Sequence, residues 1–138
     1  MAFDVQTVNI DGRVTALGRA GSHTLVIDRP AEAGGGGLGF NGGELLHLAV
    51  AGCISNDLFR EARAAGITLR RVRVTARGDF GGTPAVSQGI EYEVEVDGDA
   101  DPARLEQLVA QVDAIAEIPN SLRRGTAVRL RAAGQGRG

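Results

Sequence analysis

An apolar stretch from Glu44 to Ala65 constrains the fold of this 138-residue chain more than any other feature. Only Gly52 interrupts its helix-forming residues, and Gly66 follows as the left-handed residue that commonly ends a helix. The first half is apolar on every face and should be buried. The second half becomes amphipathic, with apolar residues such as Leu58 set against Asp57 and Arg60 on a face that should reach solvent. We therefore expect a long central helix that carries the only cysteine, Cys53.

The residues before this helix alternate between polar and apolar side chains. Residues 3–27 predict a meander of three short strands, with turns at Asp11-Gly12 and near Gly18 to Gly21. Arg29-Pro30 ends the third strand, and the run Gly34 to Gly37 predicts a loop that approaches another part of the chain closely.

Two longer strands are expected after the helix. Valine and other apolar residues recur at every second position around 72–76 and 90–96, which gives each strand one buried face. The opposite faces carry rows of arginine and glutamate that would pair across an antiparallel hairpin. The segment from Gly78 to Gly89 predicts an exposed loop between the strands.

The C-terminal part predicts a second helix and a last strand. Asp101 and Pro102 favour a helix start, and apolar spacing continues to about Ala116. Residues 118–121 should break the chain, and residues 126–132 should form a strand with Val128 and Leu130 facing inward.

The element order lacks a βαβ repeat, so it favours an α+β fold with mainly antiparallel sheets. The length fits a single domain over residues 1–138, with residues 134–138 as a frayed tail.

Composition excludes several functional classes. A net charge of -2 leaves no concentrated basic surface, so nucleic acid is not an expected partner, and the 43% of apolar residues is ordinary for a globular protein that does not span a membrane. The first residues alternate polar and apolar side chains, so no export signal is expected there, and one cysteine makes neither an internal disulfide nor a metal cluster. We expect a cytoplasmic protein without metal or cofactor, and the abundance of Gly, Ala and Arg favours a bacterial source.

Several motifs together resemble the OsmC/Ohr superfamily. That family shares a proline, paired glycines, an Asn-Pro-Glu-like helix start and a cysteine on a long central helix, with a Cys-Pro-Val-Ser segment before its last strand. The matching runs here are Asp28-Arg29-Pro30, Gly34-Gly35, Asn41-Gly42-Gly43-Glu44, Ala51-Gly52-Cys53 and Ile118-Pro119-Asn120-Ser121.

The resemblance implies an intertwined homodimer with active sites at the subunit interface. Typical members reduce organic hydroperoxides: a thiolate on the central helix attacks the peroxide, becomes a sulfenic acid and forms a disulfide with a second cysteine. An arginine orients the peroxide and favours the thiolate, and a glutamate usually assists.

Two positions decide how far this chemistry carries over. Cys53 matches the attacking cysteine, twelve residues after Asn41. Ile118 stands where the second cysteine belongs, and isoleucine forms no disulfide. A sulfenic acid on Cys53 would then be resolved by an external thiol or by Cys53 of the other subunit. Alternatively, Cys53 is a small buried hydrophobe on an apolar helix.

The other two catalytic groups of the family are displaced or missing. The glutamate position falls on Gly43, with Glu44 at the next position. The arginine position falls on Ile10, and Arg13 and Arg19 are the arginines nearby. Glu44 can also serve simply as a cap at the positive end of the helix.

Three further side chains have open roles. His47 lies six residues before Cys53, about 120° away around the helix, and is expected either as an interface histidine or close to the partner's Cys53. Arg123 and Arg124 are candidates to place a cation near Ile118, or are residues of an exposed turn.

Two functions follow as hypotheses. The first is an OsmC-like thiol protein of oxidative-stress defence that reduces organic hydroperoxides with one cysteine. The second is a catalytically degenerate relative that binds a small hydrophobic ligand at the dimer interface.

Overall fold

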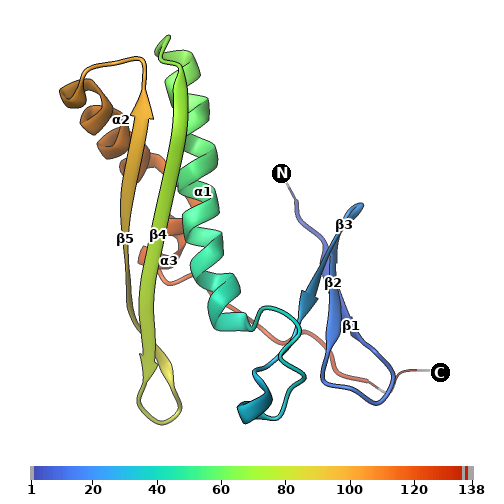
Figure 1. The fold of residues 1–138 in the computed structure, drawn as a ribbon. Helices are drawn as coiled ribbons and strands as arrows, with labels where there is room; N and C mark the ends of the chain where they lie inside the picture. The colour runs from blue at the N-terminus through green and yellow to red at the C-terminus, as the bar shows by residue number, and fades with distance from the viewer. Residues whose placement is uncertain (1, 135, 137–138) are drawn as a thin grey trace. The chain divides into compact units, whose positions relative to one another are not determined.

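The computed structural model describes residues 2–134 and 136. The chain divides into two compact units, residues 1–49 with 76–91 and residues 50–75 with 92–138. Residues 135, 137 and 138 of the predicted tail lie outside the described residues. The elements, labelled in Figure 1, are β1 Val5–Asn9, β2 Ala16–Ala20, β3 His23–Ile27, the short 3-10 helix η1 Ala31–Ala33, α1 Gly42–Ala64, β4 Leu69–Gly81, β5 Val86–Gly98, α2 Pro102–Ile115 and α3 Glu117–Arg123.

The three-stranded meander of the first unit is confirmed. β2 pairs antiparallel with both β1 and β3, with Leu17 opposite Val8 and Val26. Gly12 and Gly21 take positive φ angles of 71° and 59° in the two connections, where glycine meets little steric cost. Gly18, which was expected to begin a turn, instead lies within β2, because the strand continues to Ala20.

The glycine-rich loop after β3 folds around Asp28. Its carboxylate accepts hydrogen bonds from the hydroxyl of Thr15 and from the backbone amides of Arg29, Gly36 and Leu38. Burial alone would raise the pKa of Asp28, but these hydrogen bonds outweigh it and lower the pKa to about 2. The loop is therefore ordered by a buried anion.

The central helix α1 is confirmed within two residues at each end, and its second half is amphipathic as predicted, but its first half is only partly buried in the single chain. In the first half Val50 and Ile54 are buried but Leu48 is 50% exposed, and in the second half Leu58 and Ala62 are buried. The first half is apolar on every face, but its own chain packs against only some of these faces. Some of its apolar side chains therefore stay exposed.

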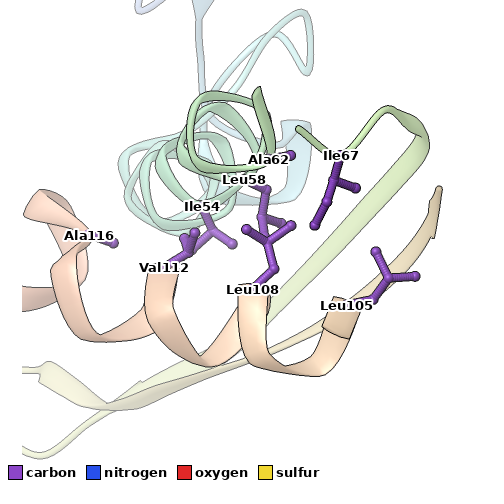
Figure 2. Packing of buried hydrophobic residues seen from close by; sticks show 8 residues of the cluster. All are labelled: Ile54, Leu58, Ala62, Ile67, Leu105, Leu108, Val112 and Ala116. Carbon is purple, nitrogen blue, oxygen red and sulfur yellow. The ribbon is translucent and has the colours of Figure 1, made fainter. Parts of the chain in front are cut away.

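The hydrophobic core lies in the second unit (Figure 2). There residues 50–64 of α1 face α2, and Leu58 and Val112 are among the largest fully buried side chains. Partly buried residues of β4 and β5, including Val74 and Val94, pack against this cluster. The cluster consists of Ile54, Leu58, Ala62, Ile67, Leu105, Leu108, Val112 and Ala116.

The two long strands are confirmed, and they extend further than predicted. β4 and β5 form a two-stranded sheet and run in opposite directions (Figure 1), and they take up most of the segment 78–89 that was expected as a loop. Backbone pairing within a hairpin continues even through glycine-rich sequence when each strand supplies the other's hydrogen bonds. The predicted pairing of opposite charges is confirmed at Arg73, whose guanidinium nitrogen lies 3.4 Å from a carboxylate oxygen of Glu95.

Helix α2 begins as predicted, with the Asp101 side chain accepting a hydrogen bond from the Arg104 amide. The predicted break at residues 118–121 is wrong, because α3 includes them. Pro119 sits in its first turn, where a missing N–H has no helical partner to lose.

The predicted last strand at residues 126–132 is also wrong. This segment forms no regular element, and Val128 and Leu130 are 94% and 84% exposed instead of facing inward. A strand needs a neighbouring strand for its backbone hydrogen bonds, and none in the described part of the chain pairs with this segment. None of the described helices is both long and apolar enough to cross a membrane.

Candidate functional site

Cys53 lies in the middle of α1, in the second unit. Its side chain is half-buried and packs against the edge of the hydrophobic core. The sulfur is 4.0 Å from Oδ2 of Asp57, one helical turn later. The thiol thus combines an apolar side with a single close carboxylate.

Asp57 is a buried acid that the sequence pattern did not predict. It was placed on the solvent-facing side of α1, but it is only 8% exposed. Its Oδ1 lies 3.3 Å from Arg60, which also donates to Glu61. The hydrogen bond to Glu61, followed by the charge of Asp57, raises the pKa of Arg60. The i, i+4 spacing from Cys53 was the signal that points to this contact.

Glu44 forms a reciprocal cap at the start of α1. The Glu44 amide donates to the side chain of Asn41, and the Asn41 amide donates to the Glu44 carboxylate, at 2.9 and 3.0 Å. This capping box satisfies two amides that have no partner within the helix. The capping role foreseen for Glu44 is therefore present, and its catalytic role stays a prediction.

His47 is held by its neighbours in the first unit. Its Nδ1 donates to the backbone carbonyl of Gly43 at 2.6 Å, and its ring meets Phe80 edge to face, with 6.4 Å between ring centres. The other nitrogen, Nε2, is buried without a hydrogen-bond partner in the described part of the chain. A Cβ at Gly78 would lie 2.4 Å from Nε2, so the ring needs a glycine there.

Gly43, at the family's glutamate position, lies beside Phe80. A Cβ on Gly43 would be 3.2 Å from the Phe80 ring, which is tighter than ordinary van der Waals contact. A pocket of about 390 Å³ opens here, with Arg77 and Glu44 among its lining residues. A larger side chain at Gly43 therefore needs Phe80 to shift.

The two arginine candidates occupy different places in the first unit. Arg13 lies in the exposed connection between β1 and β2, and Arg19 is exposed on β2 opposite Gln6 and Thr24. Arg19 and Leu45 line the same pocket, of about 270 Å³, on the meander. Arg13, Arg19 and Glu44 all belong to the first unit and Cys53 to the second.

Three polar side chains fix α3 within the second unit. The Tyr92 hydroxyl donates to Asp113, and Arg123 lies 2.7 Å from the same carboxylate. Burial and the hydrogen bond to Asp113 raise the pKa of Tyr92, and the hydrogen bonds from Tyr92 and Arg123 lower that of Asp113. Arg123 shares α3 with Ile118, and Arg124 caps the end of that helix.

Among residues 2–134 and 136, no cluster of three or more His, Cys, Asp or Glu side chains is arranged to hold a metal ion. The sulfur of Cys53 contacts the carboxylate of Asp57, and Asp57 in turn pairs with Arg60.

Comparison of the sequence with protein families gives a match to the OsmC-like protein family over residues 34–131. The match includes both Cys53 and Ile118 and confirms the resemblance inferred from the motifs. Among curated proteins, none matches the chain.

Solved structures with the same fold come from several bacteria. An OsmC-like protein of Mycoplasma pneumoniae has a TM-score of 0.76 at 17% identity, covering 91% of this chain and 89% of its own. An organic hydroperoxide resistance protein OsmC of Legionella pneumophila has a TM-score of 0.66 at 21% identity, covering 89% and 90%. The organic hydroperoxide resistance protein OhrB of Bacillus subtilis has a TM-score of 0.61 at 18% identity, covering 91% of this chain and 93% of its own. These likenesses confirm the predicted α+β fold with antiparallel sheets and a long helix.

Proposed function

This chain belongs to the OsmC-like protein family, and from that premise we propose that it is a thiol protein of oxidative-stress defence that reduces organic hydroperoxides with Cys53. The observation that carries the proposal is the family match around Cys53, which sits in the middle of the long helix and is not fully buried. Two structures of the same fold bear the name of organic hydroperoxide resistance proteins, which favours this substrate class.

The proposed reaction uses one cysteine of the chain and a thiol from outside it. The sulfur attacks the outer peroxide oxygen, the O–O bond breaks, and the products are an alcohol and a sulfenic acid on Cys53. Because Ile118 cannot form a disulfide, a first external thiol converts the sulfenic acid to a mixed disulfide and water, and a second thiol releases Cys53. A bacterial cytoplasm, rich in small thiols, is the compartment that suits this cycle.

Peroxide consumption tests the proposal. The purified protein is mixed with cumene hydroperoxide and a small dithiol, and Cys53→Ser serves as the matched control. We expect consumption, and trapping of a sulfenic acid, only with the wild-type protein. Equal rates for wild type and Cys53→Ser would overturn the proposed function.

We further propose that the protein acts as a homodimer. Large apolar side chains of the first half of α1 and of the meander, such as Leu48 and Val5, are exposed in the single chain. Exposed apolar surface of this extent is a common mark of a protein interface. Light scattering after size-exclusion chromatography should give a molar mass of twice the chain's 14.3 kDa. The variant Leu48→Asp should have the mass of a single chain. A monomeric wild-type protein would contradict the dimer.

A second function, binding of a small hydrophobic ligand, is favoured by the pocket of about 270 Å³ on the meander. Leu25, Ile27 and Leu45 contribute apolar side chains to its lining, which polar residues such as Arg19 and His23 also border. Pockets of this character commonly hold hydrophobic ligands. Native mass spectrometry of gently purified protein should then reveal a retained lipid or aromatic compound that is lost in Leu25→Asp. A ligand-free mass together with peroxide consumption would favour the reductase.

A further inference from the structure

The carboxylate of Asp57 is unusual for its degree of burial. It is 8% exposed, whereas Arg60 and Arg63 of the same helix are exposed. Burying a carboxylate costs free energy unless its oxygens have partners. Here one oxygen faces the guanidinium of Arg60 at 3.3 Å, and the other faces the sulfur of Cys53 at 4.0 Å.

These three side chains form a line on one face of α1. Cys53, Asp57 and Arg60 stand at positions i, i+4 and i+7, which a helix brings to the same side. All three belong to the second unit, so their arrangement depends only on the local helix and its core. The line thus brings together a thiol, a carboxylate and an arginine, the kinds of group that the proposed reaction needs.

We propose that Asp57 is a catalytic residue of the proposed peroxidase, accepting the thiol proton of Cys53 as the sulfur attacks, and that Arg60 is a positioning residue that holds the carboxylate. This rests on the proposed function. The carboxylate contacts the reacting sulfur atom, whereas Arg60 acts through Asp57. A distance of 4.0 Å is long for proton transfer, but catalytic hydrogen bonds are often long without substrate and tighten in the complex with it.

The step balances in atoms and electrons. A sulfur lone pair forms the S–O bond to the outer oxygen of the hydroperoxide, and the O–O electron pair leaves on the alkoxide. The S–H proton passes to Oδ2 of Asp57 and from there to the alkoxide, which becomes the alcohol. Sulfur is oxidised by two electrons to the sulfenic acid, the peroxide is reduced by two, and Asp57 ends as the carboxylate with which it began.

The test compares peroxide reduction by wild type, Asp57→Asn, Arg60→Gln and the control Glu106→Gln, an exposed acid on α2. General-base catalysis contributes on the order of 10²-fold or more, so Asp57→Asn should lower the second-order rate constant for cumene hydroperoxide by about that factor. Arg60→Gln should lower it less, Arg60→Lys should restore part of the loss, and Glu106→Gln should match wild type. The wild-type reaction should also run slower in heavy water.

Each outcome bears on a distinct claim. If wild type is active and Asp57→Asn is equally fast or faster, the role of Asp57 is overturned while the proposed function stands. If wild type is no more active than Cys53→Ser, both are overturned. Should Asp57→Asn fail to fold, as judged by circular dichroism, the heavy-water comparison decides, because equal rates in the two solvents exclude proton transfer in the attacking step.

Discussion

The two units of the chain are held together in different ways. In the second unit α1, α2 and the ends of the long strands enclose a cluster of aliphatic side chains that water does not reach. In the first unit the buried side chains of the described residues are polar, Thr15 and Asp28. Many of its large apolar side chains face solvent instead, among them Phe3, Val5, Val8, Leu38, Phe40 and Phe80.

This contrast separates a unit stabilised by its own side chains from one that depends on backbone fit and on hydrogen bonds to one carboxylate. Apolar burial is the main favourable contribution to folding, so the second unit should hold most of the chain's stability. The apolar surface of the first unit is exposed in the single chain, and the proposed second copy would bury it.

The largest effect is expected in the aliphatic core. Leu58→Ala removes a fully buried side chain and should lower the free energy of unfolding by about 2–5 kcal/mol, through lost burial and the cavity left behind. Denaturant unfolding measures it. The control Leu38→Ala, at a side chain that is 64% exposed in the first unit, should cost far less. Equal losses would mean that the first unit also buries its apolar side chains in solution.

A smaller loss is expected where backbone fits closely against backbone in the first unit. A Cβ on Gly39 would lie 2.2 Å from the carbonyl oxygen of Val26, which accepts a hydrogen bond from the Phe40 amide. Gly39→Ala should therefore cost about 1–3 kcal/mol as the loop shifts away from β3. Thermal unfolding measures the loss. An unchanged midpoint would show that the loop yields without cost.

The Asp28 carboxylate should make the first unit sensitive to acid. Its pKa falls from the ordinary 3.8 to about 2 on folding, so the unfolded state binds the proton more readily. The stabilisation is fully present above about pH 4 and is lost as pH falls through 2. Hydrogen exchange at the Gly36 and Leu38 amides should be faster in Asp28→Asn than in wild type at pH 6, with the difference shrinking toward pH 2. A difference independent of pH would contradict the role of the charge.

The smallest effect is a gain. Gly52 lies inside α1, and a Cβ there would meet nothing within 4 Å in the single chain. Gly52→Ala should raise the free energy of unfolding by about 0.5–1 kcal/mol, because alanine loses less backbone entropy in a helix. Chemical denaturation measures this gain at protein concentrations too low for the proposed dimer to form. A loss in place of the gain would mean that a neighbour absent from the single chain lies against this face.

Much of the fold was predictable from local patterns. The limits of α1, the three-stranded meander and the start of α2 follow from apolar spacing, glycine positions and the Asp101 cap, all of which act over a few residues. The structure of segment 126–132 was not predictable in this way. Its alternation of valine and leucine with arginine is typical of a strand, but a strand also needs a pairing partner, which the local pattern does not identify.

The candidate site was also predictable from the sequence only in part. Cys53 and the capping contribution of Glu44 were recognisable from their places on the helix, since both depend on local sequence. Asp57 was placed on the wrong side, because amphipathic spacing does not reveal which face of a long helix the rest of the chain covers. The line of thiol, carboxylate and arginine became apparent only once that face was known.

The sequence by itself determined a long apolar helix, its single thiol at Cys53, the loss of the second cysteine at Ile118 and membership of the OsmC-like protein family. These features are local or depend on motifs, so they are present before any long-range contact forms. The tertiary structure alone decided which side chains of α1 are buried and that the sulfur lies near the Asp57 carboxylate. Burial and side-chain contact are set by residues distant in the chain, and no local pattern encodes them.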